Sequence, residues 1–549
     1  MQAEAKAYPL LQDDFLKYIS ETLGTEPWVK VYESAGSLSG LGGRHCFFSA
    51  FIPNERIAVA LSHTSWDLRI GNGKPGQSVS YTGKNGKEKI DYLRFGEPGG
   101  IEPLVIFREF HGAMPDYIEI SEEFRHFHNL YHDRQADKFV AIDEDGDIED
   151  VIIIEPKCIK IRLQYLKQFL AIKDMHLAIF FDRFAYSDKR LEDHGLTKIS
   201  EDVSGALLKA HRHVDNFDFG SKEEQKSISR VVGKKLIPGV SKEKSRFWPH
   251  QDEKKYEEFI IGLDQDGRPL SHSCEESKLS NYFGANPGAP RDVTPVFFRR
   301  EVLGKYYSNP KKFSVEDGYL RCGSLWGLRM DNNHKQYVVV LLSDLGDLSH
   351  KEQLYWKSYN VAPDGEMSSV SYKRNFLSEF TDPDSADLRF KMKFESFNIN
   401  WLKAVGWPLF KLLAAADEHF YTSLRVPLTD DPAELDTQAL SLSKVLIDSL
   451  NEEELCNRIS DLPKDAKGIM KLEVYLREQG FVDYAPRMKF LRNLFDLRNG
   501  AGHRKGVKYE RAAVVFRVNE LKPNQCFETV LEGAIEVLDY LSQRLPSSR

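Results

Sequence analysis

The stretch from about residue 396 to the C-terminus constrains the fold most, because its apolar residues recur with the period of an α-helix. Its last segment carries apolar residues at i, i+3, i+4 and i+7 spacing and stops before Pro546. The pattern predicts helices over residues 401–422, 436–450, 466–479, 485–499 and 526–545. About 150 residues with such helices can bury a core of their own. We therefore expect residues 396–549 to form an all-α helical bundle.

Residues before 396 follow another pattern, in which short apolar runs alternate with turn signals. Lys138–Ile142 and Val151–Ile154 flank Asp145-Gly146, a dipeptide that favours a hairpin. Tyr337–Leu342 is a continuous apolar run, typical of a buried strand. The length of 549 residues exceeds that of one ordinary domain. We expect a multidomain α+β protein with a mixed α/β domain over 1–205, a strand-rich region over 206–395 and the helical domain.

One short motif inside the helical region combines two chemical roles. Arg498 and Asn499 stand five and four residues before His503, in the string Leu-Arg-Asn-Gly-Ala-Gly-His. Arginine binds a phosphate by a rigid two-pronged contact, and histidine exchanges a proton near neutral pH. Along an unbroken helix, five residues turn the two side chains about 140° apart. The glycines Gly500 and Gly502 favour a bend, which could bring them to one cleft, or a second subunit could complete the site.

This Arg-Asn-x-x-x-His element, late in a helical region, resembles the HEPN superfamily, and more narrowly the C-terminal HEPN domains of bacterial abortive-infection proteins. The resemblance covers about 150 residues and implies a bundle of four or more helices. It also implies a metal-independent endoribonuclease without a cofactor, acting as a homodimer through this domain. By analogy, the N-terminal two-thirds would sense a phage-derived trigger or select the RNA, and a neighbouring antitoxin remains a possible partner.

The mechanism implied by the resemblance is RNA transesterification. His503 would act as general base or acid while the ribose 2′-OH attacks the adjacent phosphate. Arg498 would stabilise the charge that develops on that phosphate, and Asn499 would orient a reacting group. Arg504, Lys505 and Lys508 follow the histidine and add positive potential beside it. The alternative within the same family is a HEPN-like domain that binds RNA or dimerises without cutting.

A second group of basic residues lies between positions 222 and 246, interrupted by glycines and prolines and followed by Phe247-Trp248. Such a segment is typical of a surface or of an inter-domain connection. It could also follow a phosphate backbone and stack bases on its aromatic residues. The residues that we expect to contact nucleic acid here are Lys234, Lys235, Arg246 and Trp248.

A metal-dependent hydrolase is a further alternative. His211, His213 and Asp215 form an H-x-H-x-D run similar to the zinc motif of metallo-β-lactamase-fold hydrolases. That motif has a histidine immediately after the aspartate, where this chain has Asn216. The preceding residues, 206–209, favour a helix, so a solvated helix end is the simpler interpretation, and we predict no metal.

Charge and cysteine content limit the binding partners and the cellular compartment that we expect. The net charge of −8 gives no overall attraction to nucleic acid, so any contact needs a local basic patch. The six cysteines are scattered without a C-x-x-C pair, which suits a reducing compartment. The N-terminus is polar, and no apolar segment is long enough to span a bilayer. We therefore expect a cytoplasmic protein without a membrane partner.

Overall fold

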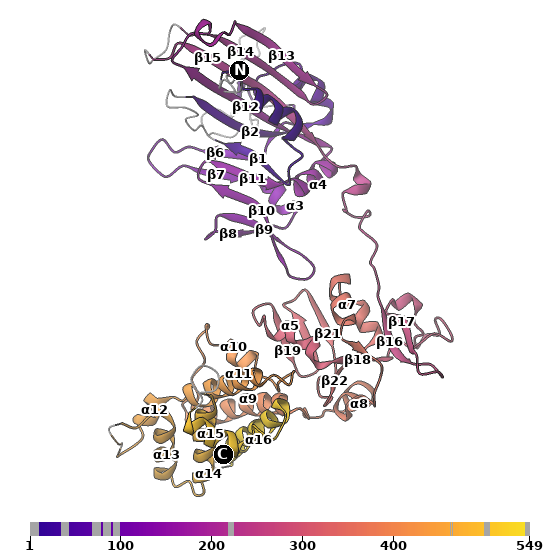
Figure 1. Cartoon of the computed structure of the whole chain (residues 1–549), viewed down its shortest axis with the longest axis vertical. Coiled ribbons are helices and arrows are strands. Elements are labelled where there is room, and N and C mark those ends of the chain that lie inside the picture. Colours follow the sequence, from indigo (N-terminus) through magenta and orange to yellow (C-terminus); the bar gives the residue numbers. More distant parts are fainter. Residues whose placement is uncertain are drawn as a thin grey trace, which may run out of the picture. The chain divides into compact units, whose positions relative to one another are not determined.

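The computed structural model describes residues 10–33, 43–68, 78–80, 89–91, 99–217, 224–461, 463, 465–498 and 506–543. The chain divides into two compact units (Figure 1). Unit 1 comprises Met1–Asp143 and Asp147–Glu253, and unit 2 comprises Glu144–Gly146 and Lys254–Arg549.

Unit 1 is built on one large antiparallel sheet with the order β13-β14-β15-β12-β2-β1-β11-β10-β9-β8, and β5 also pairs with β2. The long strands β12 and β15 pair along their whole length, from His176↔Pro238 to Ser187↔Ser227. Two small hairpins, β3-β4 and β6-β7, stand outside this path. The strands are β1 Trp28–Glu33, β2 Arg44–Pro53, β3 Ser78–Ser80, β4 Lys89–Asp91, β5 Glu102–Pro103, β6 Val105–Arg108, β7 Tyr117–Ile120, β8 Tyr131–Asp133, β9 Lys138–Ile142, β10 Ile148–Glu155, β11 Cys158–Arg162, β12 Met175–Ser187, β13 Ile199–Gly205, β14 Leu208–Asn216 and β15 Ser227–Pro238.

Helices cover part of this sheet, and the core lies beneath them. They are α1 Asp13–Lys17, α2 Ile57–Ala60, α3 Glu122–Phe127 and α4 Leu163–Lys173. Helix α4 buries Leu166, Phe169 and Leu170, which belong to the same core as alternate residues of β1, β2, β11 and β12. The apolar side chains on every second strand residue thus pack against the apolar side of α4, and together they form one buried layer.

The structure corrects the boundary that we placed at residue 205. Strands β13, β14 and β15 belong to the same sheet as β12, so unit 1 continues to Glu253. The segment that we interpreted as a connection contains β15. A Cβ on Gly233 would lie 2.3 Å from the Lys209 carbonyl oxygen, so β14 approaches β15 because this residue has no side chain. The predicted pairing of Lys138–Ile142 with the strand after Asp145-Gly146 is confirmed by β9 and β10.

The first half of unit 2 consists of three small antiparallel sheets and four helices. The sheets are β16-β17, β22-β18-β23 and β19-β20-β21. Trp356 and Phe298 pack at its centre, with ring centroids 4.8 Å apart. The elements are β16 Glu258–Leu263, β17 Pro269–Ser273, β18 Pro295–Arg299, α5 Gly304–Tyr307, β19 Phe313–Glu316, β20 Tyr319–Cys322, β21 Trp326–Arg329, β22 Tyr337–Leu341, α6 Leu342–Gly346, α7 His350–Lys357, β23 Asn360–Val361 and α8 Ser369–Phe376.

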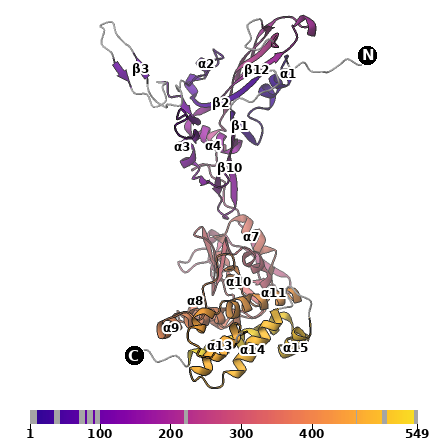
Figure 2. The same ribbon diagram turned by 90° about the vertical axis from the view of Figure 1, so that its left-hand side faces the viewer.

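The second half of unit 2 is helical, as the sequence predicts. Its helices are α9 Ala386–Val405, α10 His419–Thr422, α11 Pro432–Ser443, the π-helical turn η7 Lys444–Asp448, α12 Glu452–Cys456, α13 Gly468–Glu478, α14 Ala485–Leu497, α15 Val507–Val515 and α16 Pro523–Ser542. Figure 2 shows α13, α14 and α15 at the end of unit 2 away from its strands. Helices α9 and α16 lie side by side, and Lys393 pairs with Asp539 at 2.8 Å.

One predicted helix is wrong, and the helical part starts earlier than expected. The helix expected over 401–422 instead begins at Ala386, inside the predicted middle region, and ends at Val405. Gly406 caps it with φ of 82°, a left-handed conformation that stops a helix. The chain as a whole is α+β, with a large antiparallel sheet followed by a helical region. None of the described helices is both long and apolar enough to cross a lipid bilayer.

Candidate functional site

Arg498 stands directly after the last residue of α14, at an end of the helical bundle. Leu491 and Leu494, on the same side of α14, are buried in the core. The Arg498 guanidinium donates from Nη1 to Asp448 Oδ1 at 2.7 Å and to Ser443 Oγ at 3.3 Å. It also stacks on Phe495, with Cζ 3.9 Å from the ring centroid. The arginine is therefore held in one orientation rather than free in solvent.

The partners of Arg498 come from two adjoining elements: Ser443 is the last residue of α11, and Asp448 is the last residue of the π-helical turn η7. The hydrogen bonds of η7 join residues five apart, so the wider turn brings Ser443 and Asp448 to one side. Asp448 also pairs through Oδ2 with Lys444 at 3.4 Å. The Arg498 side chain remains 20% exposed, and its Nε and Nη2 groups bond to no residue in the described part of the chain. This free edge has the spacing that binds two oxygens of a phosphate.

The rest of the motif lies outside the described residues. Asn499, His503, Arg504 and Lys505 are among the positions 499–505 for which no structure is given. Lys508 is described, and its side chain is exposed in the first turn of α15. The structure thus gives the surroundings of the arginine and leaves its relation to His503 as a prediction.

Two of the residues that we expected to contact nucleic acid in unit 1 are used internally. Lys234 is fully buried, and its Nζ donates to both carboxylate oxygens of Asp67 at 2.7 Å. Burial lowers the pKa of Lys234, while Asp67 opposes that shift. Lys235 is half-buried and donates to the Ser20 carbonyl oxygen at 2.7 Å. The prediction for Lys234 is therefore wrong, because this side chain is buried in an internal ion pair, whereas the one for Lys235, which points to the opposite face of β15, stays a prediction.

Arg246 and Trp248 fit that prediction better, because both are exposed. Arg246 pairs with Asp252 at 3.1 Å, in an ion pair whose two side chains are 75% and 73% exposed. Such a pair is weak and opens readily in water. Trp248 is 75% exposed, which is unusual for the largest apolar side chain.

The metal-dependent alternative receives no geometric support. His211 and His213 lie on β14, and residues 206–209 form a turn and the start of this strand rather than a helix. His211 contacts Asp202 at 2.8 Å and Ser200 at 3.4 Å. Among the described residues, no three or more His, Cys, Asp or Glu side chains are placed to hold a metal ion.

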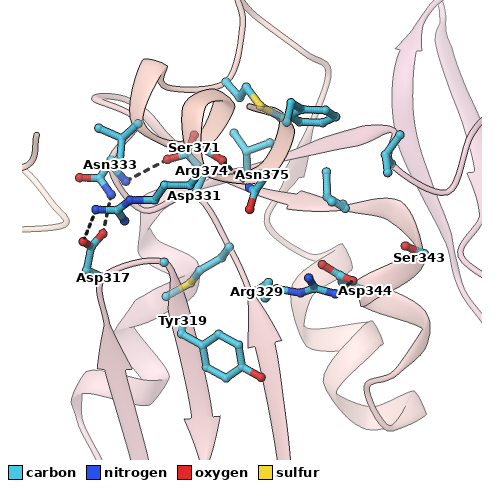
Figure 3. A pocket seen from close by; sticks show the side chains of 18 of the residues that line it. Asp317, Tyr319, Arg329, Asp331, Asn333, Ser343, Asp344, Ser371, Arg374 and Asn375 are labelled. Carbon is cyan, nitrogen blue, oxygen red and sulfur yellow. Dashed lines mark hydrogen bonds and ion pairs between the residues drawn. The ribbon is translucent and has the colours of Figure 1, made fainter. Parts of the chain in front are cut away.

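A polar cavity in the strand-rich half of unit 2 was missed by sequence reasoning (Figure 3). Its volume is about 440 Å³. On one side Asp317 accepts from Arg374 and from Asn333, both at 2.8 Å. On the other side Asp344 lies 3.7 Å from Arg329, and burial raises its pKa. The buried Asp344 Oδ2 atom has no hydrogen-bond partner among the described residues, so this lining residue carries an unsatisfied acceptor.

A second cavity, of about 500 Å³, lies between α5 and β19 on one side and α9 and α10 on the other. It is lined by aromatic rings, and the Nζ atom of Lys391 lies 5.9 Å from the ring centroids of Tyr307 and Tyr421. Nζ donates to the Thr422 carbonyl oxygen at 3.2 Å. Burial lowers the pKa of Lys391 to about 8, so part of this amine is neutral near physiological pH. No sequence signal marked this lysine, because its neighbours come from distant segments.

A partly buried histidine in unit 1 makes stability depend on pH. His128 contacts the Tyr165 carbonyl oxygen at 3.0 Å, and burial lowers its pKa from 6.5 to about 4. Between these values the unfolded chain binds more protons than the folded one, so acid favours unfolding. We expect a loss of roughly 2–3 kcal/mol as the pH falls through this window. Urea unfolding at about pH 7 and about pH 4 measures it. His128→Phe should flatten the dependence, and an unchanged slope would contradict this account.

Comparison with known proteins assigns no family: no family model, no curated protein and no solved structure matches the chain.

Proposed function

We propose that this chain is a HEPN-type endoribonuclease of bacterial abortive infection, which cleaves RNA in the cytoplasm without a metal ion. The observation that supports it best is the anchoring of Arg498. Nη1 is fixed by Asp448 and Ser443, and the Nε–Nη2 edge has no partner in the described chain. A guanidinium held in this way can bind a phosphate with little reorganisation, which is how enzymes stabilise developing charge.

In the proposed reaction His503 removes the proton of a ribose 2′-OH, which then attacks the neighbouring phosphorus atom. The bond to the 5′ oxygen of the next nucleotide breaks, and that oxygen takes up a proton. The products are a 2′,3′-cyclic phosphate and a 5′-hydroxyl. Arg498 holds the phosphate oxygens, and Asn499 orients the phosphate or His503. No oxidant or co-reactant is needed.

We place the contact of the proposed homodimer on α15, the helix that follows the motif. Val507, Val514 and Val515 are more than half exposed there. Apolar surface of this kind favours a protein contact over solvent. A phage-derived molecule, or release from an antitoxin, would then switch the dimer on. The non-catalytic alternative is a dimer that binds RNA and leaves it intact.

The test is a cleavage assay with purified protein, single-stranded RNA and EDTA. We expect wild-type protein to give products with 2′,3′-cyclic phosphate ends, identified by mass spectrometry. His503→Ala should lower the rate by about 10²–10⁴-fold, the usual contribution of a general acid or base. RNA that stays intact while bound would favour the non-catalytic alternative. Equal cleavage by both proteins would exclude His503 from the reaction.

A further inference from the structure

Unit 1 carries a cleft between the N-terminal half of α4 and the segment that follows β15. Its volume is about 670 Å³. The two walls are joined by hydrogen bonds from Gln168 Nε2 to the Ser245 carbonyl oxygen at 2.7 Å and from Val240 N to the Lys167 carbonyl oxygen at 3.2 Å. Figure 1 shows α4 beside the chain that leaves this unit. One wall of the cleft is thus helical, and the loop that forms the other wall is tied to it by these hydrogen bonds.

The charge of the cleft is of one sign. Arg162, Lys167, Lys244 and Arg246 line it, and none of its described lining residues is acidic. The two cavities of unit 2, by contrast, include three or more carboxylates each. The cleft is positively charged although the whole chain has a net charge of −8. Its positive potential would raise the local concentration of anions.

The four cations are not equally available. Arg162 is held by Glu149 at 3.2 Å and donates to the Asp150 carbonyl oxygen. Among the described residues, the ion pair of Arg246 is the exposed one with Asp252. Lys167 and Lys244 form no ion pair within the described part of the chain, and Lys244 is exposed. Two lysines are therefore free to meet an anion, and Arg246 can exchange its partner.

Two aromatic residues, Phe247 and Trp248, directly follow Arg246 in the chain. Phe247 stacks on Phe127 of α3, with ring centroids 5.2 Å apart, and this contact anchors the segment. Trp248 follows and is 75% exposed. Tyr165, in the cleft wall, is tied to Glu149 by its hydroxyl at 2.7 Å. Trp248 thus offers an exposed ring that stacks on no other ring within the described part of the chain.

We propose that this cleft binds single-stranded RNA, with phosphates at Lys167, Lys244 and Arg246 and a base on Trp248. Cationic grooves flanked by exposed aromatic rings suit single strands, because every base has a face that stacks. The choice of RNA over DNA rests on the proposed function. The phosphate and base contacts are inferred from the cations of the cleft and from Trp248 alone. The cleft would deliver substrate to the protein independently of the residues that cut it.

The test measures binding of a fluorescent 2′-O-methyl oligouridine, which cannot be cleaved by 2′-OH attack, to the full chain in EDTA. Fluorescence anisotropy over a range of salt concentrations gives the slope of log affinity against log salt. For single strands that slope is about 0.7 per phosphate contact, so Lys167→Gln with Lys244→Gln should reduce it by about 1.4. The matched control is Lys157→Gln with Lys226→Gln, two exposed lysines outside the cleft, which should change it little.

Trp248 gives a readout that a merely structural role would not produce. Stacking should quench its fluorescence when RNA binds, and Trp248→Ala should weaken binding about fivefold or more, with Trp248→Phe in between. Equal salt slopes for the cleft and control variants would overturn the proposal, as would binding to anionic lipid vesicles but not to RNA. A deoxy-oligouridine arm tests the preference for RNA. Because cleavage is assayed separately, an inactive nuclease that still binds RNA leaves this inference standing.

Discussion

Replacing Arg498 with alanine is expected to lower the rate of RNA cleavage by about 10²–10³-fold, the usual effect of removing one preorganised donor from a developing anion. The reason lies in how the guanidinium is held, by Asp448 and Ser443 on one side and by the Phe495 ring beneath it. Arg498→Lys keeps the charge but loses the two-pronged edge, so it should recover only part of the activity.

The matched control is Arg492→Ala on the same helix. Arg492 pairs with Glu473 through side chains that are 46% and 28% exposed, so it resembles Arg498 in its ion pair but stands earlier on α14. Its replacement should leave cleavage within about twofold, since exposed pairs contribute little to stability. Circular dichroism verifies that each variant is folded. If Arg492→Ala and Arg498→Ala lose activity equally, the assignment of Arg498 is wrong.

The largest expected effect on stability comes from Lys234. Lys234→Met should destabilise unit 1 by about 3–5 kcal/mol, because it leaves the Asp67 carboxylate buried without its partner. Lys234→Met combined with Asp67→Leu removes both charges and should restore most of the loss. Urea unfolding followed by circular dichroism measures all three proteins.

The control for that experiment is Lys209→Met on the neighbouring strand. Lys209 stands opposite Lys234 in the β14–β15 register and pairs with Asp202, whose side chain is 58% exposed. A loss of about 1 kcal/mol or less is expected there. If the Lys234 single variant is no less stable than this control, or if the double variant is no more stable than the single one, the buried pair does not act as described.

Some elements of the fold follow from the local sequence pattern, and others depend on contacts between distant segments. Helices whose apolar repeat continues over many residues, such as α14 and α16, were predicted closely. The start of α9 was missed because its charged residues mask the apolar side, and α15 because it is short. The boundary at 205 failed because strand pairing joins segments far apart in sequence. The local sequence pattern thus predicts individual helices and strands, but it does not predict which distant segments pack or pair with them.

The same limit applies to the site. The sequence singled out Arg498 as a phosphate-binding residue, but it could not name its partner Asp448, which lies 50 residues away. It also gave Lys234 a surface role, because its partner Asp67 is 167 residues distant. Trp248 is exposed, and its contact with nucleic acid stays a prediction. The sequence shows which residues are charged and need a partner when they are buried, and the fold determines which residue that partner is.

The most direct test of the central claim uses an oligonucleotide in which all sugars but one are 2′-O-methylated. The proposed reaction requires a 2′-OH, so in EDTA wild-type protein should cut only after the single ribose and leave a 2′,3′-cyclic phosphate. Arg498→Ala and His503→Ala should leave this substrate intact over the same time. Cutting at any methylated position, or equal cutting by all three proteins, would contradict the proposed HEPN-type site.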